Sequence, residues 1–158
     1  MDSSSTQMTE TVQAILAATL ACGILDATAA SLQAAVTLKV KPQRVFQGVA
    51  SGLLGPRALE PGANTAILGL ALHFLIALII STIYVLAAQR LPFLLDHPLI
   101  AGGLYGIAVY LVMFYIVLPL SRRPRRPFNL KFALTQLVIH IVVIGWSIAL
   151  TARYFLLH

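Results

Sequence analysis

The apolar run from Lys131 to Thr151 is long enough to cross a lipid bilayer, and a basic loop directly precedes it. A spanning helix needs about 20 apolar residues. Polar residues recur within the run at intervals of one or two helical turns, which places them on one face: Gln136, His140, Ser147 and Thr151. The pattern predicts a membrane helix with lipid on one side and a polar neighbour on the other.

Three earlier stretches have the same character. We expect four spans, at residues 12–38, 64–89, 98–120 and 131–153. The apolar segment 43–55 is too short to cross, and it is interpreted as an interfacial or re-entrant helix that packs through Gly48 and Gly52. The short connection at residues 90–97 favours antiparallel neighbours. The predicted fold is an all-α integral membrane protein, a single domain built as an antiparallel four-helix bundle.

The composition supports a membrane protein and excludes two other classes. The hydrophobic share is 59% and the charged share only 10%, whereas soluble domains carry about 25% charged residues. The net charge of +6 is not spread over a face with interleaved aromatics, as a nucleic-acid reader requires. We therefore expect the lipid bilayer as partner and no nucleic acid.

The distribution of basic residues predicts the orientation. Of the 11 lysines and arginines, all but Arg90 and Arg153 fall in or beside the first and third loops. The positive-inside rule then places loops 39–63 and 121–130 in the cytoplasm and both termini outside. We expect the following residues to anchor the chain on anionic lipid headgroups: Lys39, Lys41, Arg44, Arg122, Arg123, Arg125, Arg126 and Lys131.

Each span carries one polar or titratable residue near the middle of the bilayer. With a rise of about 1.5 Å per residue, Asp26 lies about 18 Å from the cytoplasmic end, Tyr110 about 15 Å, and His73 and His140 about 14 Å. A carboxylate at that depth is costly and is a candidate functional group. The predicted intramembrane polar site comprises Asp26, His73, Tyr110, Gln136, His140 and Ser147.

Three interpretations of this site remain open. Aspartate and histidine can carry a proton or ion path, because burial moves their protonation toward neutral pH. Two histidines and a carboxylate are also a known metal ligand set, but the sequence lacks local ligand spacing. Alternatively, each group only bonds a neighbouring helix, contributing about 0.6 kcal/mol. No metal and no cofactor are predicted.

An enzymatic function finds little support. Ala50-Ser51-Gly52 lacks the frame of a nucleophile elbow, and neither a glycine-rich phosphate loop nor paired carboxylates occur. We therefore do not expect an enzyme.

The C-terminal half contains His73-Phe74 through Tyr84, the proline turn, the glycine-rich start of the third span, Leu118-Pro119-Leu120, and His140 followed by Trp146-Ser147-Ile148. In these features the chain resembles the YagU-like inner-membrane proteins. The resemblance implies a small multi-pass protein of a bacterial inner membrane without an assigned biochemical activity. It maps His73, Pro119 and His140 onto family positions and supplies no mechanism.

These features support two functional hypotheses. The first, which the sequence alone slightly favours, is a structural or accessory membrane subunit without an assigned activity, acting in a homo-oligomer or a larger membrane complex. The alternative is a protein that conducts or senses protons or a small ion through Asp26, His73 and His140.

Overall fold

The structure is a computed structural model and describes residues 3–60, 63–124 and 127–158. Every regular element in these ranges is helical. The long helices are α1 (Ser3–Leu38), α3 (Ala63–Ala88), α5 (Pro98–Val112) and the pair α7 (Leu130–Ile139) and α8 (Trp146–Leu157). The shorter ones are α2 (Pro42–Leu54), the 3₁₀ turn η1 (Gly55–Leu59), α4 (Phe93–Asp96) and α6 (Leu118–Leu120).

Four helical segments are long and apolar enough to cross a membrane: Gln7–Leu38, Asn64–Ala88, Pro98–Leu120 and Leu130–Leu157. Large apolar side chains stay exposed along them, including Leu16, Ile67, Leu104 and Val138. The prediction of an all-helical chain with four such helices is confirmed. Helix α1 begins at Ser3, earlier than predicted, and the hydroxyls of Thr9 and Thr11 bond back to carbonyls one turn before them.

Two of the four segments contain a π-helical turn, which the sequence did not predict. η2 (Met113–Val117) joins α5 to α6, and η3 (His140–Gly145) joins α7 to α8. The turn η2 directly precedes the segment with Pro119, whose missing N–H breaks the regular hydrogen-bond ladder. Single π turns of this kind are often found at functional sites.

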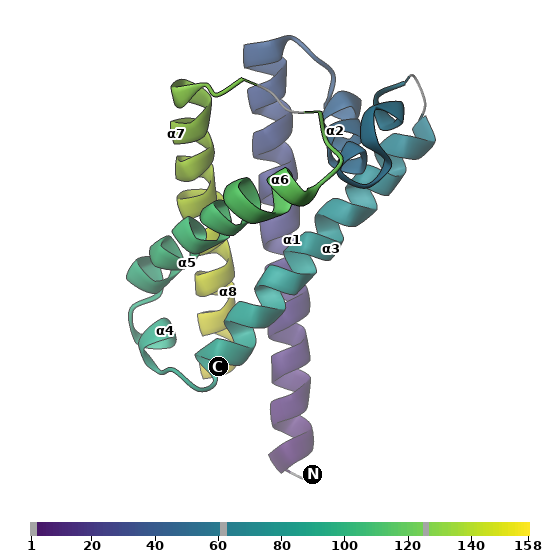
Figure 1. Cartoon of the computed structure of the whole chain (residues 1–158). Coiled ribbons are helices and arrows are strands. Elements are labelled where there is room, and N and C mark those ends of the chain that lie inside the picture. The colour runs from purple at the N-terminus through teal and green to yellow at the C-terminus, as the bar shows by residue number, and fades with distance from the viewer. Residues whose placement is uncertain (1–2, 61–62, 125–126) are drawn as a thin grey trace.

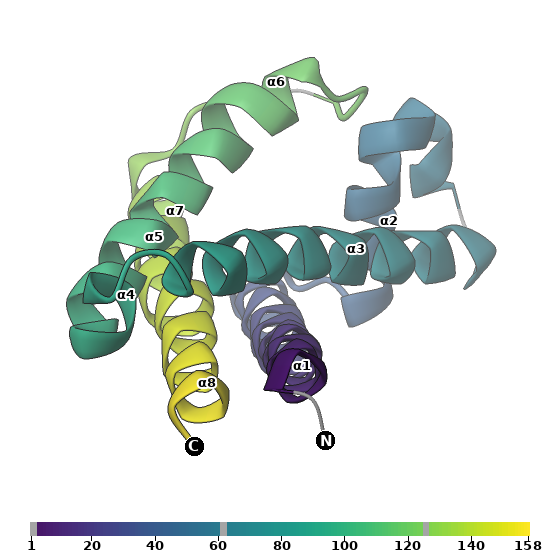
Figure 2. The ribbon, with the colours of Figure 1, turned by 90° about the horizontal axis from the view of Figure 1, so that it is seen from below.

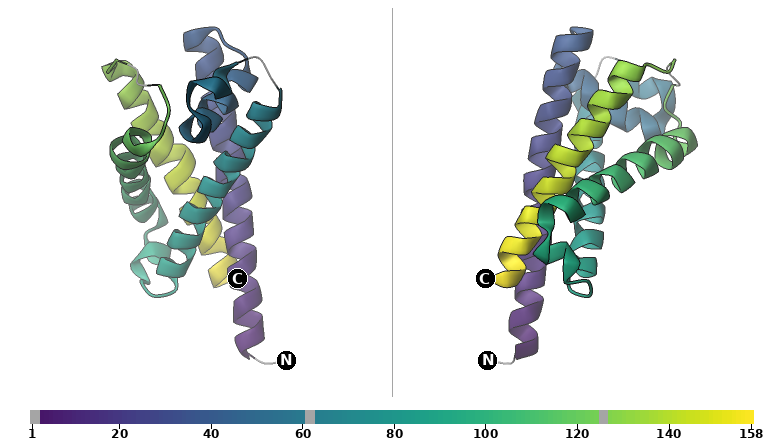
Figure 3. Two further views of the ribbon diagram at one scale, coloured as in Figure 1. Left: turned by 45° about the vertical axis from the view of Figure 1, so that its right-hand side comes forward. Right: turned by 90° about the vertical axis from the view of Figure 1, so that its left-hand side faces the viewer.

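The long helices contact one another in a defined order. Helix α1 packs along α3 and α8, and α5 packs against η3 and α8. Seen from below, almost along α1 and α8, α3 runs crosswise past one side of both helices (Figure 2). The N- and C-termini and α4 lie at one end of the molecule, and α2 and the basic loop lie at the other (Figure 1). The α5–α6 segment leans away from α1 toward the α2 end (Figure 3).

Glycines allow the crossing of α5 with η3. A methyl group on Gly106 would overlap the carbonyl of His140, and one on Gly145 would overlap the carbonyl of Gly102. Gly102 and Gly106 lie one turn apart on α5, and small residues at this spacing let membrane helices approach closely. The structure uses this face within the chain, so it is not available to a second copy.

Helix α2 joins the start of α3 to the basic loop. The carbonyl of Phe46 lies so close to Gly69 of α3 that any side chain there would collide with it. On its other side, the carbonyl of Gly52 accepts a 2.9 Å hydrogen bond from the Arg122 amide. The Gly48/Gly52 face therefore packs against the basic loop, through Arg123 and Ser121.

The buried core lies in the half of the molecule nearer the termini. It is built largely from small residues, among them Ala14, Ala18, Ala77, Ala88 and Ala149. Small side chains let helices approach closely without relying on a hydrophobic driving force, as membrane helices require.

Candidate functional site

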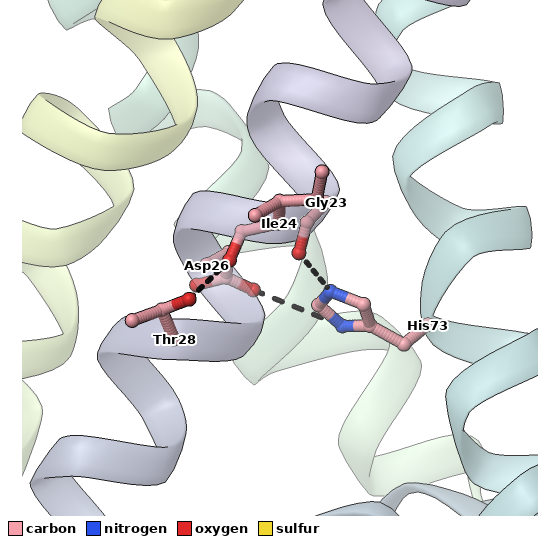
Figure 4. A network of polar contacts seen from close by, with 5 residues as sticks. All are labelled: Gly23, Ile24, Asp26, Thr28 and His73. Atoms are coloured by element: carbon pink, nitrogen blue, oxygen red, sulfur yellow. Dashed lines mark hydrogen bonds and ion pairs between the residues drawn. The ribbon is translucent and has the colours of Figure 1, made fainter.

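Asp26 of α1 and His73 of α3 face each other where the two helices cross. The Nδ1 atom of His73 lies 3.9 Å from Oδ2 of Asp26. The Nε2 atom of the same ring lies 2.9 Å from the carbonyl oxygen of Gly23 (Figure 4). The side chains are 14% and 22% exposed for His73 and Asp26, so both are largely withdrawn from the surface.

The Gly23 contact determines where the imidazole proton sits. A carbonyl oxygen only accepts hydrogen bonds, so His73 Nε2 must carry the hydrogen that is donated to Gly23. In the neutral ring, Nδ1 is then a proton acceptor, and it is this atom that faces the Asp26 carboxyl. A proton on Asp26 can therefore move to His73, and a proton on His73 Nδ1 can move back. At 3.9 Å the transfer needs a small approach of the side chains or one bridging water.

Gly23 also explains why α3 comes this close. A Cβ at Gly23 would lie 2.5 Å from a ring carbon of Phe74, the residue after His73. The absence of a side chain lets the Phe74 ring lie against α1 and brings the imidazole to the Gly23 carbonyl. Two aromatic rings surround the His73 ring: Phe74 at 5.5 Å and Phe46 at 6.2 Å between centroids.

His140 lies in a second polar group on η3. Its Nδ1 donates to the Gln136 carbonyl at 2.8 Å, which leaves Nε2 as the acceptor in the neutral ring. The rings of Tyr110 and Phe114 pack edge-on against it, with centroids at 5.5 and 6.0 Å. His140 is also within electrostatic range of Asp26. The structure thus places Asp26 next to His73 and within the field of His140.

The remaining predicted site residues take separate positions. The Gln136 amide donates to the Gln33 amide oxygen at 2.5 Å, linking α7 to α1. The Ser147 hydroxyl donates to the Val143 carbonyl at 2.5 Å and lies beside Cys22. Gln136 therefore joins two helices, whereas Ser147 belongs to a buried polar group that sequence reasoning missed.

That missed group contains Cys22, Tyr84 and Tyr105. Cys22 lies one turn before Asp26 on α1, and Tyr105 packs against the buried cluster that contains Cys22. The Tyr84 and Tyr105 rings meet at 5.0 Å. The spacing of Cys22 from Asp26 was a usable signal, since residues four apart share a helix face. Nothing in the sequence indicated that Tyr105 would point into the core.

A metal centre finds no geometric support. Among the described residues, no group of three or more His, Cys, Asp or Glu side chains lies close enough to hold a metal ion. Asp26 and His73 form a pair, and His140 sits with aromatic rings rather than in a ligand shell.

The predicted headgroup anchors fall into three groups. Lys39, Lys41, Arg122 and Lys131 have exposed side chains at the α2 end. Arg44 is exposed but its guanidinium bonds the Leu59 carbonyl and the Gln47 amide oxygen, and Arg123 lies half-buried against Gly48. These two arginines thus also contact their own chain. Arg125 and Arg126 lie outside the described residues.

Comparison with known proteins yields no relative: no protein-family model, curated protein or solved structure matches the chain. The resemblance to the YagU-like proteins therefore stays a prediction. The function has to be inferred from the residues and their geometry alone.

Proposed function

We propose that this chain is a multi-pass membrane protein that moves or senses protons through the Asp26–His73 pair. The observation that supports this proposal most directly is the distance of 3.9 Å between His73 Nδ1, a proton acceptor, and Oδ2 of Asp26. Both residues lie in helices of spanning length. Ionisable groups inside a membrane are costly and commonly mark proton relays. Two such groups from different helices meet here, which packing alone does not require.

The pair can hold one proton in two ways. Either Asp26 is a neutral acid beside a neutral imidazole, or a carboxylate faces an imidazolium. Both states leave the pair without net charge, which lowers the cost of burying it. Gain of a second proton, or loss of the one held, gives the pair a net charge. The nearby His140 ring would then respond to that charge through the field it shares with Asp26.

The membrane is proposed to be a bacterial inner membrane, with both termini outside. Two observations support this orientation. The exposed basic residues gather at the α2 end, and the termini lie together at the opposite end (Figure 1). The positive-inside rule assigns the basic end to the cytoplasm.

The second candidate function is that of an accessory membrane subunit. Large apolar side chains are exposed on α1 and α5, such as Leu20, Leu32 and Ile100, and they suit a neighbouring protein helix as well as lipid. A stoichiometric partner that co-purifies in mild detergent would support this hypothesis. A monodisperse particle containing this chain alone would argue against it.

The proposal is tested by proton flux into proteoliposomes that carry a membrane potential and an internal pH-sensitive dye. The wild-type chain should carry protons faster than empty vesicles, and Asp26→Asn should remove most of that flux. Glu60→Gln is the matched control, because Glu60 has an exposed side chain at the loop before α3. Equal flux in the wild type and Asp26→Asn would overturn the proposal.

A further inference from the structure

Polar groups continue from Asp26 toward the end of the molecule that holds the termini. Cys22 lies one turn before Asp26 on α1 and beside Ser147 of α8. Tyr105 of α5 comes next, packed against the buried core cluster that contains Cys22. The ring of Tyr84 lies beyond it, at 5.0 Å from that of Tyr105. Each contact joins a different pair of helices, so the groups line their common interior.

The tyrosine hydroxyls are held by backbone carbonyls. Tyr105 donates to the Ile80 carbonyl at 2.6 Å, and Tyr84 donates to the Leu94 carbonyl at 3.1 Å. Each oxygen keeps its lone pairs free to accept another hydrogen bond. A backbone carbonyl cannot pass a proton on, so each hydroxyl relays a proton by first turning its hydrogen from the carbonyl to a neighbouring group or water.

Ser81 provides a buried hydroxyl that can bind a water molecule. Its side chain is fully buried, and among the described residues its hydroxyl is the buried side-chain group without a hydrogen-bond partner. Ser81 lies one turn before Tyr84 on the inward face of α3. Buried polar atoms of this kind are usually satisfied by internal water. A water here would lie beside the polar groups Cys22, Tyr105 and Tyr84, which we call the polar column.

The column ends at a cavity of about 300 Å³ near the termini. Glu10 and Asp96 line this cavity, together with Gln7, Gln89 and Leu95. Leu95 comes directly after Leu94, whose carbonyl accepts from Tyr84, so the tyrosine hydroxyl is bonded one residue away from the cavity lining. Two carboxylates at the cavity attract cations rather than anions.

On the α2 side the pair is bordered by apolar groups rather than by further polar side chains of the route. The Phe46 ring of α2 lies against His73, and the Phe46 backbone is packed onto Gly69 one turn before it. Beyond α2 the surface carries exposed basic residues, including Arg57 and Arg122. Positive charge at that end disfavours the approach of protons from that side.

We propose that protons reach the Asp26–His73 pair from the terminus side. They enter at the Glu10/Asp96 cavity and pass Tyr84, Tyr105 and the Cys22–Ser147 contact, with water at Ser81. At each hydroxyl or thiol the incoming proton bonds to a free lone pair while the group's own proton turns from its present acceptor to the next group or to a water, so one proton enters at the cavity and one is added to the Asp26 carboxylate. This route rests on the proposed function of the pair.

Removing the two hydroxyls tests the route. In proteoliposomes, Tyr84→Phe and Tyr105→Phe should each lower proton flux by roughly tenfold or more, as expected when a relay group is lost. Tyr115→Phe is the control, since Tyr115 is 68% exposed on the same span as Tyr105. Thermal unfolding monitored through Trp146 fluorescence identifies a variant that fails to fold.

A second measurement uses the native Cys22 as the target of a blocking ion, so the wild-type chain is tested without a substitution. Cys22 is the single cysteine of the chain, and silver ions bind thiolates while being small enough to enter a water-lined path. Silver added at the terminus side should block flux, and silver added at the basic side should not. The Cys22→Ser variant, which binds no silver, should lose this response.

The outcomes separate the two proposals. If Asp26→Asn does not change the flux, the proposed function fails and the route fails with it. If Asp26→Asn stops the flux while both tyrosine variants conduct like the wild type, only the route is wrong. Block by silver from the basic side, or equally from both sides, would also overturn the route.

Discussion

His73 donates one ring nitrogen to the Gly23 carbonyl and turns the other toward Asp26, 3.9 Å away. Because Gly23 and Asp26 lie on the same helix, α1 both orients the imidazole and supplies its proton partner. A histidine that only joined the two helices would need only the hydrogen bond to Gly23. The second contact places a proton acceptor opposite a carboxyl group, which is the arrangement a relay requires.

The crossing of α5 with η3 should tolerate one glycine substitution and reject another. Gly106→Ala forces a methyl group into the His140 carbonyl, and overpacking of this kind costs about 1–3 kcal/mol. Gly103→Ala is the matched control, because its nearest contact would be 3.7 Å away. Thermal unfolding in mild detergent should show a lower midpoint for Gly106→Ala only. Equal midpoints would contradict the packing of α5 on η3.

The contact between α2 and the basic loop predicts a disulfide. A Cβ on Gly52 would lie 3.7 Å from Cβ of Ser121, within the range of about 3.5–4.5 Å found in disulfides. The double variant Gly52→Cys/Ser121→Cys should therefore cross-link on mild oxidation. Loss of labelling by a maleimide–polyethylene glycol measures it, since the native Cys22 is buried. The pair Leu53→Cys/Ser121→Cys should stay reduced, because Leu53 is an exposed neighbour. Cross-linking of both pairs, or of neither, would contradict the docking of α2.

The orientation is testable with single cysteines at opposite ends. His158→Cys should react with a membrane-impermeant maleimide on intact cells, because we place both termini outside. Lys41→Cys should react only after the membrane is opened. Both positions are exposed, so reactivity reports the side of the membrane. The reverse pattern would invert the orientation and move the acidic cavity to the cytoplasm.

The Gln33–Gln136 hydrogen bond should contribute modestly to stability. Changing either residue to leucine removes a contact between α1 and α7. A double-mutant cycle on unfolding in mixed detergent should give a coupling of about 0.6 kcal/mol, a typical value between membrane helices. A coupling of zero would show that the two amides do not meet in the folded protein.

Hydrophobic run length was enough to predict the four long helices, because a spanning helix needs a continuous apolar stretch whatever it packs against. Position within each run also placed Asp26 and His73 at similar depth. It could not show that they meet, since depth along a helix says nothing about which helix lies opposite. Their meeting depends on Gly23, whose missing side chain lets α3 approach.

The parts that sequence reasoning missed depend on contacts between segments far apart in the chain. The π turn at His140–Gly145 and the inward position of Tyr105 both arise where α5 crosses η3 through Gly102 and Gly106. Periodicity identifies a small-residue face, but it does not identify the partner. The glycine face could have packed against a second copy or against the chain itself, and the structure shows the latter.

The central claim, that Asp26 and His73 act as one proton-carrying unit, is tested most directly by a double-mutant cycle on proton flux. Asp26→Asn removes the carboxyl group, and His73→Gln keeps a donor for Gly23 while removing the titratable ring. Two residues that act as a unit show strongly non-additive effects. We predict that each single variant loses most of the flux and that the double variant loses no more. Losses that multiply independently, or flux that persists in either single variant, would contradict the claim.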